Sequence, residues 1–300
     1  MAKEKQSLKY CVLDVFTNER FKGNPLAVVF TEGDLELPLY ENISREFGYS
    51  ETSFIYYSKQ DKALKVRSFT PTGFEVNGAG HNLLGAVCAA LLKKENIFHE
   101  QQGNPFVIMK DKPIHLYINY DHANELPVVG MMQQSAVIST TIAPKIIAEA
   151  IRLQANDLLT ENFAATVVRT EVTHLMVPLK KLEALNKIIP NKTLLIKIAL
   201  QYGFDGVYCF AFTEHDPENI VQTRFFNPGI GIDEDAATGS AAGPLAGLLY
   251  QKQFISLNTG YQLLQGIKMN QPSAIKFMVQ EQGILITGSS IITMEGIIYE

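Results

Sequence analysis

Apolar runs and polar breaks alternate along this chain in patterns that predict both strands and helices. Short runs rich in β-branched and aromatic residues predict strands, and apolar residues spaced three and four apart predict helices. The predicted strands are 9–16, 26–30, 52–57, 63–69, 106–109, 115–120, 165–169, 174–177, 206–212, 220–226, 260–264, 274–280, 284–288 and 291–299. The predicted helices are 37–47, 82–94, 143–151, 193–202 and 242–251. The helices at 82–94 and 242–251 are apolar on nearly every side, so we expect both to be buried.

One pattern of residues occurs twice. Residues 48–51 (Gly-Tyr-Ser-Glu) precede a predicted strand and, further on, residues 67–71 (Arg-Ser-Phe-Thr-Pro). Residues 203–206 (Gly-Phe-Asp-Gly) likewise precede a predicted strand and then residues 224–228 (Arg-Phe-Phe-Asn-Pro). Each copy runs into a glycine-rich turn that opens an apolar helix. The chain is therefore predicted to be a duplicated domain.

The repeat predicts an α+β fold of two pseudo-symmetric domains, each a central apolar helix surrounded by β-sheet. A length of 300 residues fits two domains. We expect the first domain at 1–120 and the second at 126–287, with a linker at 121–125. A strand within 288–300 follows the second domain, and we expect it to complete the first. Two related halves can build a cleft from two opposed helix N-termini, which is where the functional site is expected.

Composition indicates packed cores and a small ligand. Hydrophobic residues make up 46% of the chain and charged residues 19%, unlike a disordered composition. A net charge of −5 without a long basic run argues against nucleic-acid binding. The charged start lacks the apolar run of a secretory signal, and the longest helical apolar stretch, 83–92, is about half a bilayer span. We expect a cytoplasmic protein with no nucleic-acid or membrane partner.

The cysteines are predicted to be packing residues. Cys11, Cys88 and Cys209 each lie in an apolar segment, and none has the Cys-x-x-Cys spacing of redox or zinc sites. Free cysteine is commonly buried in such segments.

The glycine-rich turns are candidate anion-binding sites. Backbone N–H groups at a helix N-terminus carry partial positive charge, so a carboxylate or phosphate binds there readily, and glycine permits close approach. Gly80 in the first copy, and Gly239 with Ser240 in the second, are the residues concerned. The alternative is that small residues simply let each helix pack tightly against its sheet. The recurrence of the turn in both halves favours binding.

The two copies differ at a position that could carry chemistry. Aligning 48–51 with 203–206 places Glu51 opposite Gly206, directly before a strand. A glutamate before an apolar strand is usually a solvated surface residue, but this junction recurs in both copies. A single carboxylate in an enclosed cleft would have its pKa raised by desolvation, which suits general acid and base chemistry near neutral pH. We therefore predict that Glu51 is functional.

Further polar candidates lie around the two helix starts. His81 falls in the first helical turn, where the helix dipole disfavours a positive charge, so we expect a neutral ring that hydrogen-bonds or shares a proton. A lone histidine is more often structural. Asp233, Glu234 and Asp235 precede the second helix, and one of them could cap it. Because three acids cannot all be caps, Asp235, the one closest to the glycine turn, is predicted to face the substrate.

Longer motifs give the chain a family resemblance. It resembles the PhzF-like isomerases of phenazine biosynthesis, and the match covers essentially the whole chain. The segments that carry it are 14–17 (Asp-Val-Phe-Thr), 23–29 (Gly-Asn-Pro-Leu-Ala-Val-Val), 50–54 (Ser-Glu-Thr-Ser-Phe), 69–71 (Phe-Thr-Pro), 80–81 (Gly-His), 233–246 (Asp-Glu-Asp-Ala-Ala-Thr-Gly-Ser-Ala-Ala-Gly-Pro-Leu-Ala), 264–267 (Leu-Gln-Gly-Ile) and 271–273 (Gln-Pro-Ser).

The resemblance implies the diaminopimelate epimerase-like fold, an inter-domain site, a homodimer, and no metal or organic cofactor. It implies the isomerisation of a small cyclic carboxylate such as a dihydro-hydroxyanthranilate, with Glu51 shuttling the proton. The positions that match the family's substrate-binding residues are Ser50, Gly80, His81, Asp235, Gly239 and Ser240. The related epimerases and racemases use two cysteines at the glycine turns. Ala79 and Thr238 stand in those places here, so we do not expect two-thiol racemisation.

One segment departs from the family's pattern, and two other functions are less consistent with the sequence. Residues 75–82 replace residues that are more apolar or proline-bearing in the phenazine member, so we expect the substrate to differ. A non-catalytic ligand-binding or scaffold protein that keeps the fold is the alternative, and the retained acid, histidine and glycine turns argue against it. A dinucleotide site fails on spacing, because Leu83 occupies the third glycine's place.

Overall fold

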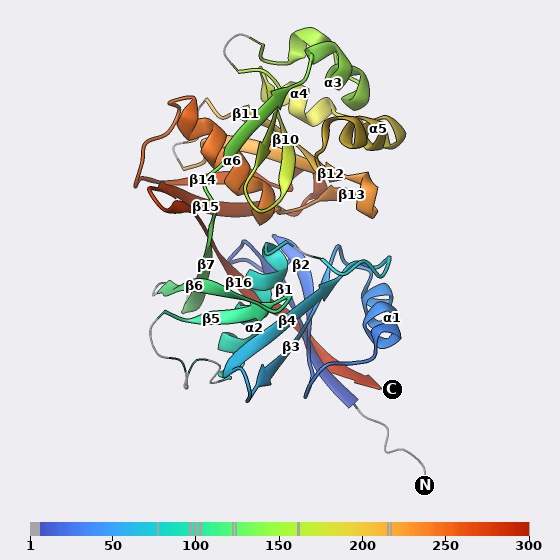
Figure 1. The fold of residues 1–300 in the computed structure, drawn as a ribbon, viewed down its shortest axis with the longest axis vertical. Helices are drawn as coiled ribbons and strands as arrows, with labels where there is room; N and C mark the ends of the chain where they lie inside the picture. The colour runs from blue at the N-terminus through green and yellow to red at the C-terminus, as the bar shows by residue number, and fades with distance from the viewer. Residues whose placement is uncertain are drawn as a thin grey trace. The chain divides into compact units, whose positions relative to one another are not determined.

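The computed structural model describes residues 7–76, 78–95, 98, 101, 104–121, 123, 125–160, 163–214, 216 and 218–299. Two compact units make up the chain: unit 1 is Met1–Met131 with Thr287–Glu300, and unit 2 is Met132–Ile286 (Figure 1). The chain passes from one unit to the other within β7 (Leu126–Gln133) and returns within β16 (Gly283–Tyr299).

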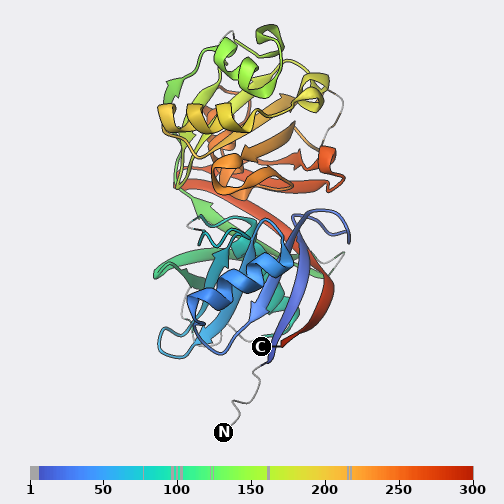
Figure 2. The ribbon, with the colours of Figure 1, turned by 90° about the vertical axis from the view of Figure 1, so that its right-hand side faces the viewer.

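Unit 1 is a ring of strands around a helix. Its other strands are β1 (Ser7–Val15), β2 (Asn24–Phe30), β3 (Thr52–Ser58), β4 (Ala63–Phe69), β5 (Phe106–Met109) and β6 (Lys112–Asp121). The strand order runs from β1 to β7 and on to β16, and β16 pairs antiparallel with β1, which closes the ring. The apolar helix α2 (His81–Leu92) lies among these strands, whereas α1 (Leu37–Phe47) packs outside (Figure 2).

Unit 2 places a sheet between one buried helix and three outer helices. Its strands are β8 (Val137–Thr141), β9 (Thr166–Arg169), β10 (Thr173–Leu179), β11 (Gly206–Phe212), β12 (Val221–Asn227), β13 (Ile232–Asp235), β14 (Gly260–Gln265) and β15 (Ser273–Gln280). Its helices are α3 (Pro144–Ile151), α4 (Leu182–Lys187), α5 (Lys192–Tyr202) and α6 (Gly239–Gln251). The order is β15-β14-β12-β11-β10-β9-β8, with β13 paired to β12. Helix α6 packs on β15, β10 and β9, and α3, α4 and α5 cover the other face.

The repeated sequence folds into the same elements in each unit, which confirms the predicted duplication. A helix ends at Gly48 in unit 1 and at Gly203 in unit 2, where φ is +66° and +71°, a left-handed conformation that favours glycine. The next strand pairs parallel with the strand before it, β3 with β2 and β11 with β10. It then pairs antiparallel with the strand after it, β3 with β4 and β11 with β12.

Several boundaries differ from the sequence prediction. The strands predicted at 284–288 and 291–299 form one strand, β16, of 17 residues. The predicted linker at 121–125 lies between two paired strands, β6 and β7. Their antiparallel pairing runs from Asp121 opposite Leu126 to Leu116 opposite Met131. Unit 1 therefore continues to Met131. The sequence patterns did not predict β7, β8, β13 or α4.

Close packing of α2 against β1 and β2 depends on a glycine. A Cβ atom at Gly85 would lie 2.5 Å from Leu26 Cδ2 and 2.7 Å from Val15 Cγ2, and all three residues are buried. We expect Gly85→Val to lower the free energy of unfolding by about 1–3 kcal/mol, because the buried side chains have to shift. Gly33→Val is the control, since nothing lies within 4 Å of a Cβ there. Chemical denaturation of both variants checks this, and equal stability would contradict it.

Candidate active site

The first glycine turn is closed by a side chain of its own helix. Gly80 precedes α2, and the side-chain oxygen of Asn82 accepts hydrogen bonds from the N–H groups of Gly80 (2.7 Å) and Leu83 (2.9 Å). The amide nitrogen of Asn82 donates to the carbonyl of Gly78 at 3.1 Å. Within the described part of the chain, the N–H groups of His81 and Asn82 have no hydrogen-bond partner. Unpaired N–H groups at a helix start are the kind of donor that binds anionic groups.

Three of the predicted residues lie together at this turn. Glu51 directly precedes β3, and its Oε2 lies 3.7 Å from Nδ1 of His81. The hydroxyl of Ser50 lies 3.5 Å from Nε2 of the same ring. Exposed fractions of the Glu51 and His81 side chains are 11% and 5%. At the start of α2, a buried imidazole therefore lies between a buried carboxylate and a hydroxyl.

Burial makes His81 a neutral group. Desolvation lowers the pKa of His81 to about 3. A neutral imidazole has one N–H donor and one acceptor nitrogen. When the Glu51 carboxylate is ionised, the donor is the Nδ1–H that faces it, so Nε2 is the acceptor for the Ser50 hydroxyl. Contacts of this length are common in unliganded sites and shorten when substrate binds.

In unit 2, Asp235 and a glutamine hold the second glycine turn. Thr238 precedes α6, and its hydroxyl donates to Oδ2 of Asp235 at 2.6 Å. The side-chain oxygen of Gln265 accepts from the N–H of Thr238 at 3.1 Å, and its nitrogen donates to the Asp235 carbonyl at 2.8 Å. Gln133 donates to the carbonyl of Gly239 at 2.9 Å.

The remaining unit 2 candidates lie at this same turn. Gly239 is buried, Ser240 is half-buried and Asp235 is buried with 5% of its surface exposed. Among the residues that the structure describes, the N–H groups of Gly239 and Ser240 have no hydrogen-bond partner. Unit 2 thus repeats the pair of open N–H groups seen at α2.

The three acids before α6 have three different environments. Asp233 is exposed and pairs with Lys192 at 2.6 Å. Glu234 pairs with Arg224 at 2.7 Å. Asp235 alone faces the turn, where it accepts from Thr238. None of the three is the residue that caps α6, because that position belongs to Thr238.

Unit 2 has no room for a carboxylate at the position of Glu51. Its counterpart Gly206 donates its N–H to Nδ1 of His174 at 3.2 Å, and a Cβ there would lie 2.3 Å from the Phe225 ring. The strand registers, Thr52 opposite Phe69 and Val207 opposite Phe226, make Ser68 the unit 1 counterpart of Phe225. A small residue leaves space in unit 1, and an aromatic ring fills it in unit 2.

The residues that close the turns were not predicted from the sequence. Asn82 is next to His81, and an amide in the first turn of a helix is a recognisable capping signal. Gln133 and Gln265 reach their turn from β7 and β14, so no local spacing indicates them. In the departing segment 75–82, Glu75 is paired with Arg67 and Lys110.

Other predictions concern cysteines, metals and membranes. Cys11, Cys88 and Cys209 are buried and free, as predicted. No group of three metal-ligating side chains occurs among the described residues. No helix in the described ranges is long and apolar enough to cross a membrane. The cytoplasmic location, the homodimer and the absence of a nucleic-acid partner stay predictions.

Solved structures define the fold class. A Bacillus anthracis phenazine biosynthesis protein of the PhzF family has a TM-score of 0.85 with this chain at 21% identity, covering 98% of this chain and 99% of that one. A hydroxyproline epimerase from Agrobacterium vitis, solved with bound trans-4-OH-L-proline, has a TM-score of 0.62 at 11% identity and covers 98% and 92%. The chain therefore has the α+β fold shared by PhzF proteins and the diaminopimelate epimerase-like proteins.

Within this class the family is defined by sequence. The family model of phenazine biosynthesis-like proteins, PhzC-PhzF, matches residues 13–296, so the chain belongs to this family. Trans-2,3-dihydro-3-hydroxyanthranilate isomerase of Pseudomonas aeruginosa is 29% identical over 300 residues, 97% of this chain and 99% of the relative. An uncharacterized isomerase of Clostridium acetobutylicum is 33% identical over 242 residues, 79% and 77% respectively. These relatives support a PhzF-like isomerase.

The buried histidines predict acid-sensitive stability. Desolvation lowers the pKa of both His81 and His174 to about 3, below the ordinary value of about 6.5. The unfolded chain therefore binds more protons between these values, and each histidine lowers the free energy of unfolding by up to about 1.4 kcal/mol per pH unit as the pH falls from 6.5.

Denaturant unfolding of wild type and His81→Gln between pH 7 and pH 4.5 measures this contribution. We expect the stability difference between the two proteins to shift in favour of the variant as the pH falls. A difference that stays constant with pH would show that His81 is protonated equally in both states.

Proposed function

We propose that this protein is an isomerase that moves a proton on a small cyclic carboxylate, related to dihydro-hydroxyanthranilate, with Glu51 as general base and general acid. The supporting observation is the buried Glu51 carboxylate 3.7 Å from the neutral His81 ring, at a position where the second copy has only Gly206. The name of the Pseudomonas aeruginosa relative supplies the substrate class.

Each step of the proposed reaction uses one group of the chain. Glu51 takes a proton from a ring carbon, and the C–H electron pair delocalises into the conjugated ring system. The protonated Glu51 then returns that proton to a different carbon, so the double bonds move while the atoms of the substrate are conserved. A single carboxylate suffices for both transfers, and the reaction needs no redox change or cofactor.

His81 supports this cycle as a hydrogen-bond donor. Its neutral Nδ1–H stabilises the ionised form of Glu51, which is the form that accepts the proton. Because burial keeps the imidazole itself uncharged, His81 does not compete with Glu51 as the base at neutral pH. The acceptor-only Glu51 carboxylate favours the tautomer with the proton on Nδ1, and the Ser50 hydroxyl, on the other side of the ring, can then donate to Nε2.

The glycine turns supply binding rather than proton transfer in this proposal. The open N–H groups of His81 and Asn82, and those of Gly239 and Ser240, suit a substrate carboxylate or a developing oxyanion. Asp235 carries a negative charge next to the second turn, so it suits a substrate hydroxyl or amino group.

Loss of the Glu51 carboxyl is expected to abolish turnover. Trans-2,3-dihydro-3-hydroxyanthranilate is the first substrate to test, followed by other small cyclic carboxylates. Glu51→Gln keeps the size and removes the proton acceptor, so kcat is expected to fall by about 10³-fold or more. Turnover by wild type in D2O should place deuterium on a product carbon, which mass spectrometry detects. Full activity of Glu51→Gln would favour a binding or scaffold protein instead.

Asp235 is expected to act on substrate binding. Asp235→Asn keeps an oxygen that accepts from Thr238 but removes the charge, so KM is expected to rise about tenfold or more with a smaller effect on kcat. Asp233→Asn is the matched control, because Asp233 lies in the same strand and pairs with Lys192 at the surface. Steady-state kinetics of the two variants make the comparison. An unchanged KM in Asp235→Asn would remove Asp235 from the binding site.

A further inference from the structure

The same arginine–glutamate pair occurs once in each unit. In unit 1, Arg67 Nε donates to Oε1 of Glu75 at 2.9 Å and the second guanidinium nitrogen donates to Oε2 at 3.1 Å. In unit 2, Arg224 makes the same two bonds to Glu234, at 2.8 and 2.7 Å. Both pairs have the two-pronged geometry of a strong guanidinium–carboxylate contact.

The two pairs occupy equivalent positions of the repeat. Each arginine lies two residues before a phenylalanine, and its guanidinium lies over that ring, 5.2 Å from the centre of Phe69 and 5.0 Å from that of Phe226. Each glutamate lies five residues before the glycine of the turn, Glu75 before Gly80 and Glu234 before Gly239. The pair therefore belongs to the duplicated architecture.

In unit 1 the pair connects the strand beside Glu51 to the segment that carries His81. Arg67 lies on β4, which pairs along its length with β3, the strand that begins just after Glu51. Glu75 lies on the segment that turns back along β4, where the N–H of Val76 donates to the carbonyl of Ser68 at 2.9 Å. Besides the backbone hydrogen bonds, the ion pair joins this returning segment to β4.

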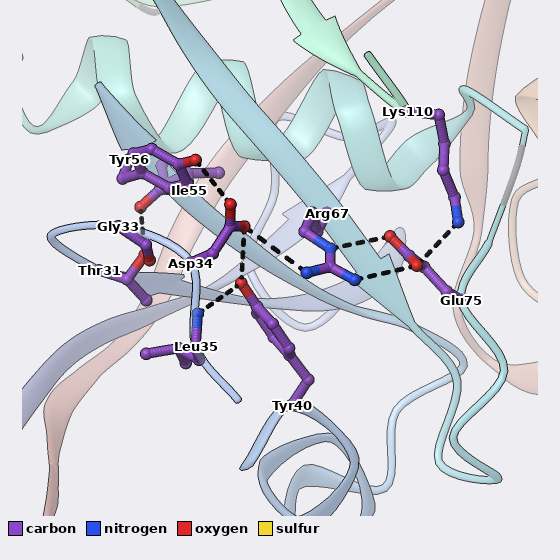
Figure 3. A network of polar contacts seen from close by, with 10 residues as sticks. All are labelled: Thr31, Gly33, Asp34, Leu35, Tyr40, Ile55, Tyr56, Arg67, Glu75 and Lys110. Carbon is purple, nitrogen blue, oxygen red and sulfur yellow. Dashed lines mark hydrogen bonds and ion pairs between the residues drawn. The ribbon is translucent and has the colours of Figure 1, made fainter. Parts of the chain in front are cut away.

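Further side chains hold the unit 1 pair (Figure 3). Asp34 contacts Arg67 at 3.5 Å, the Tyr40 ring lies 4.5 Å below its guanidinium, and Lys110 contacts Glu75 at 2.8 Å. Burial alone would raise the pKa of Glu75, but hydrogen bonds from Arg67 and Lys110 outweigh it and lower that pKa. Glu75 therefore remains ionised and paired across the neutral range.

In unit 2 the pair holds the strand that carries Asp235. Glu234 and Asp235 are neighbours on β13, and β13 pairs with β12, the strand of Arg224. Arg224 also donates to the carbonyls of Leu185 and Ile188 at 2.9 and 3.1 Å, and only 7% of its side chain is exposed. The guanidinium of Arg224 is held by Glu234 and by two backbone carbonyls, so it holds β13 in a defined position.

Stability alone does not account for keeping both pairs. The partly exposed Arg67–Glu75 pair, with 30% and 21% of its side chains exposed, is screened by water, and desolvation offsets the attraction at the buried Arg224. What a two-pronged pair adds is a fixed geometry between the two segments it joins. In both units one of those segments leads directly into the glycine turn.

We propose that Arg67–Glu75 and Arg224–Glu234 are positioning pairs, which set the glycine turn of each unit against the neighbouring strand. The unit 1 pair sets His81 against Glu51. The unit 2 pair determines the positions of Asp235 and of the N–H groups at the start of α6. This inference rests on the proposed function for what the two turns do, and on the ion-pair geometry for how they are held.

The two pairs are expected to affect different kinetic constants. Loss of the unit 1 pair misaligns the proton-transfer groups, so Glu75→Gln should lower kcat by about tenfold or more and leave KM within about twofold. Loss of the unit 2 pair misaligns the binding groups, so Glu234→Gln should raise KM by about tenfold or more with kcat within about threefold.

Matched controls come from other ion pairs on the same strands, away from the glycine turns. Asp61→Asn removes the Asp61–Lys65 pair at the β3–β4 hairpin, and Asp233→Asn removes the Asp233–Lys192 pair on β13. Both controls should keep wild-type kinetics. Arg67→Lys keeps the charge but loses the two-pronged contact, so its kcat should fall as in Glu75→Gln. Wild-type kinetics in Arg67→Lys, or equal changes of kcat and KM in both glutamate variants, would overturn the proposal.

A measurement without substrate separates this proposal from the proposed function. Hydrogen–deuterium exchange followed by mass spectrometry should show residues 78–84 exchanging about tenfold faster in Glu75→Gln than in Asp61→Asn, while α1 exchanges equally. If wild type turns over none of the cyclic carboxylates, the proposed function fails and this exchange difference still supports the positioning role. Unchanged exchange at 78–84 overturns the positioning role, whatever the kinetics show.

Discussion

The first backbone N–H groups of a buried helix need hydrogen-bond partners, and each unit of this protein is organised around such a helix. An N–H group left unsatisfied inside a protein costs about 1–3 kcal/mol. In α2 the side chain of Asn82 satisfies two amide groups at the turn, and in α6 Gln265 satisfies the amide of Thr238. Two N–H groups stay open at each turn. The start of the helix that fills each unit therefore also supplies the N–H groups that the proposed function assigns to binding.

Because the domain is duplicated, open N–H groups occur at the start of a buried helix in both units. The two units differ in the side chains next to these groups. Unit 1 combines Ser68, a small residue, with Glu51, so a carboxylate fits beside α2. Unit 2 combines Phe225 with Gly206, and the ring occupies the equivalent space. Under the proposed function, unit 1 transfers the proton and unit 2 contributes binding groups. A glutamate at 206 would collide with Phe225, so the glycine and the phenylalanine of unit 2 depend on each other.

The repeat made much of the architecture predictable from sequence. Apolar periodicity located α1 from Leu37 to Phe47, and the glycines at 48 and 203 marked helix ends in both copies. Short strands without strong alternation, such as β8 and β13, were missed, because their structure comes from pairing with distant strands. The single strand β16 was predicted as two, since no periodicity indicates that one strand continues from unit 2 into unit 1.

The residues of the candidate site that lie in recognisable motifs were predictable from the sequence, whereas the ion-pair partners that support them were not. Ser50, Glu51 and His81 were named from motif and alignment, and they lie together in unit 1. The partners of Arg67 and Arg224 were not named, although Glu75 and Glu234 share one spacing to a glycine. Comparing the copies for charge as well as for glycine would have found them.

The two turns also differ in what their geometry depends on. Asn82 belongs to α2 itself, so a side chain of this helix closes the turn that precedes it. The second turn depends on Gln265 from β14 and Gln133 from β7, and Gln265 is itself held by the Tyr208 hydroxyl at 2.8 Å. Its shape is therefore set by the packing of the whole sheet of unit 2. A substitution in β7 or β14 can therefore alter the second turn, whereas the side chain that closes the first turn belongs to the helix that follows it. Both turns share the arginine–glutamate pair, which joins the segment before each turn to a neighbouring strand.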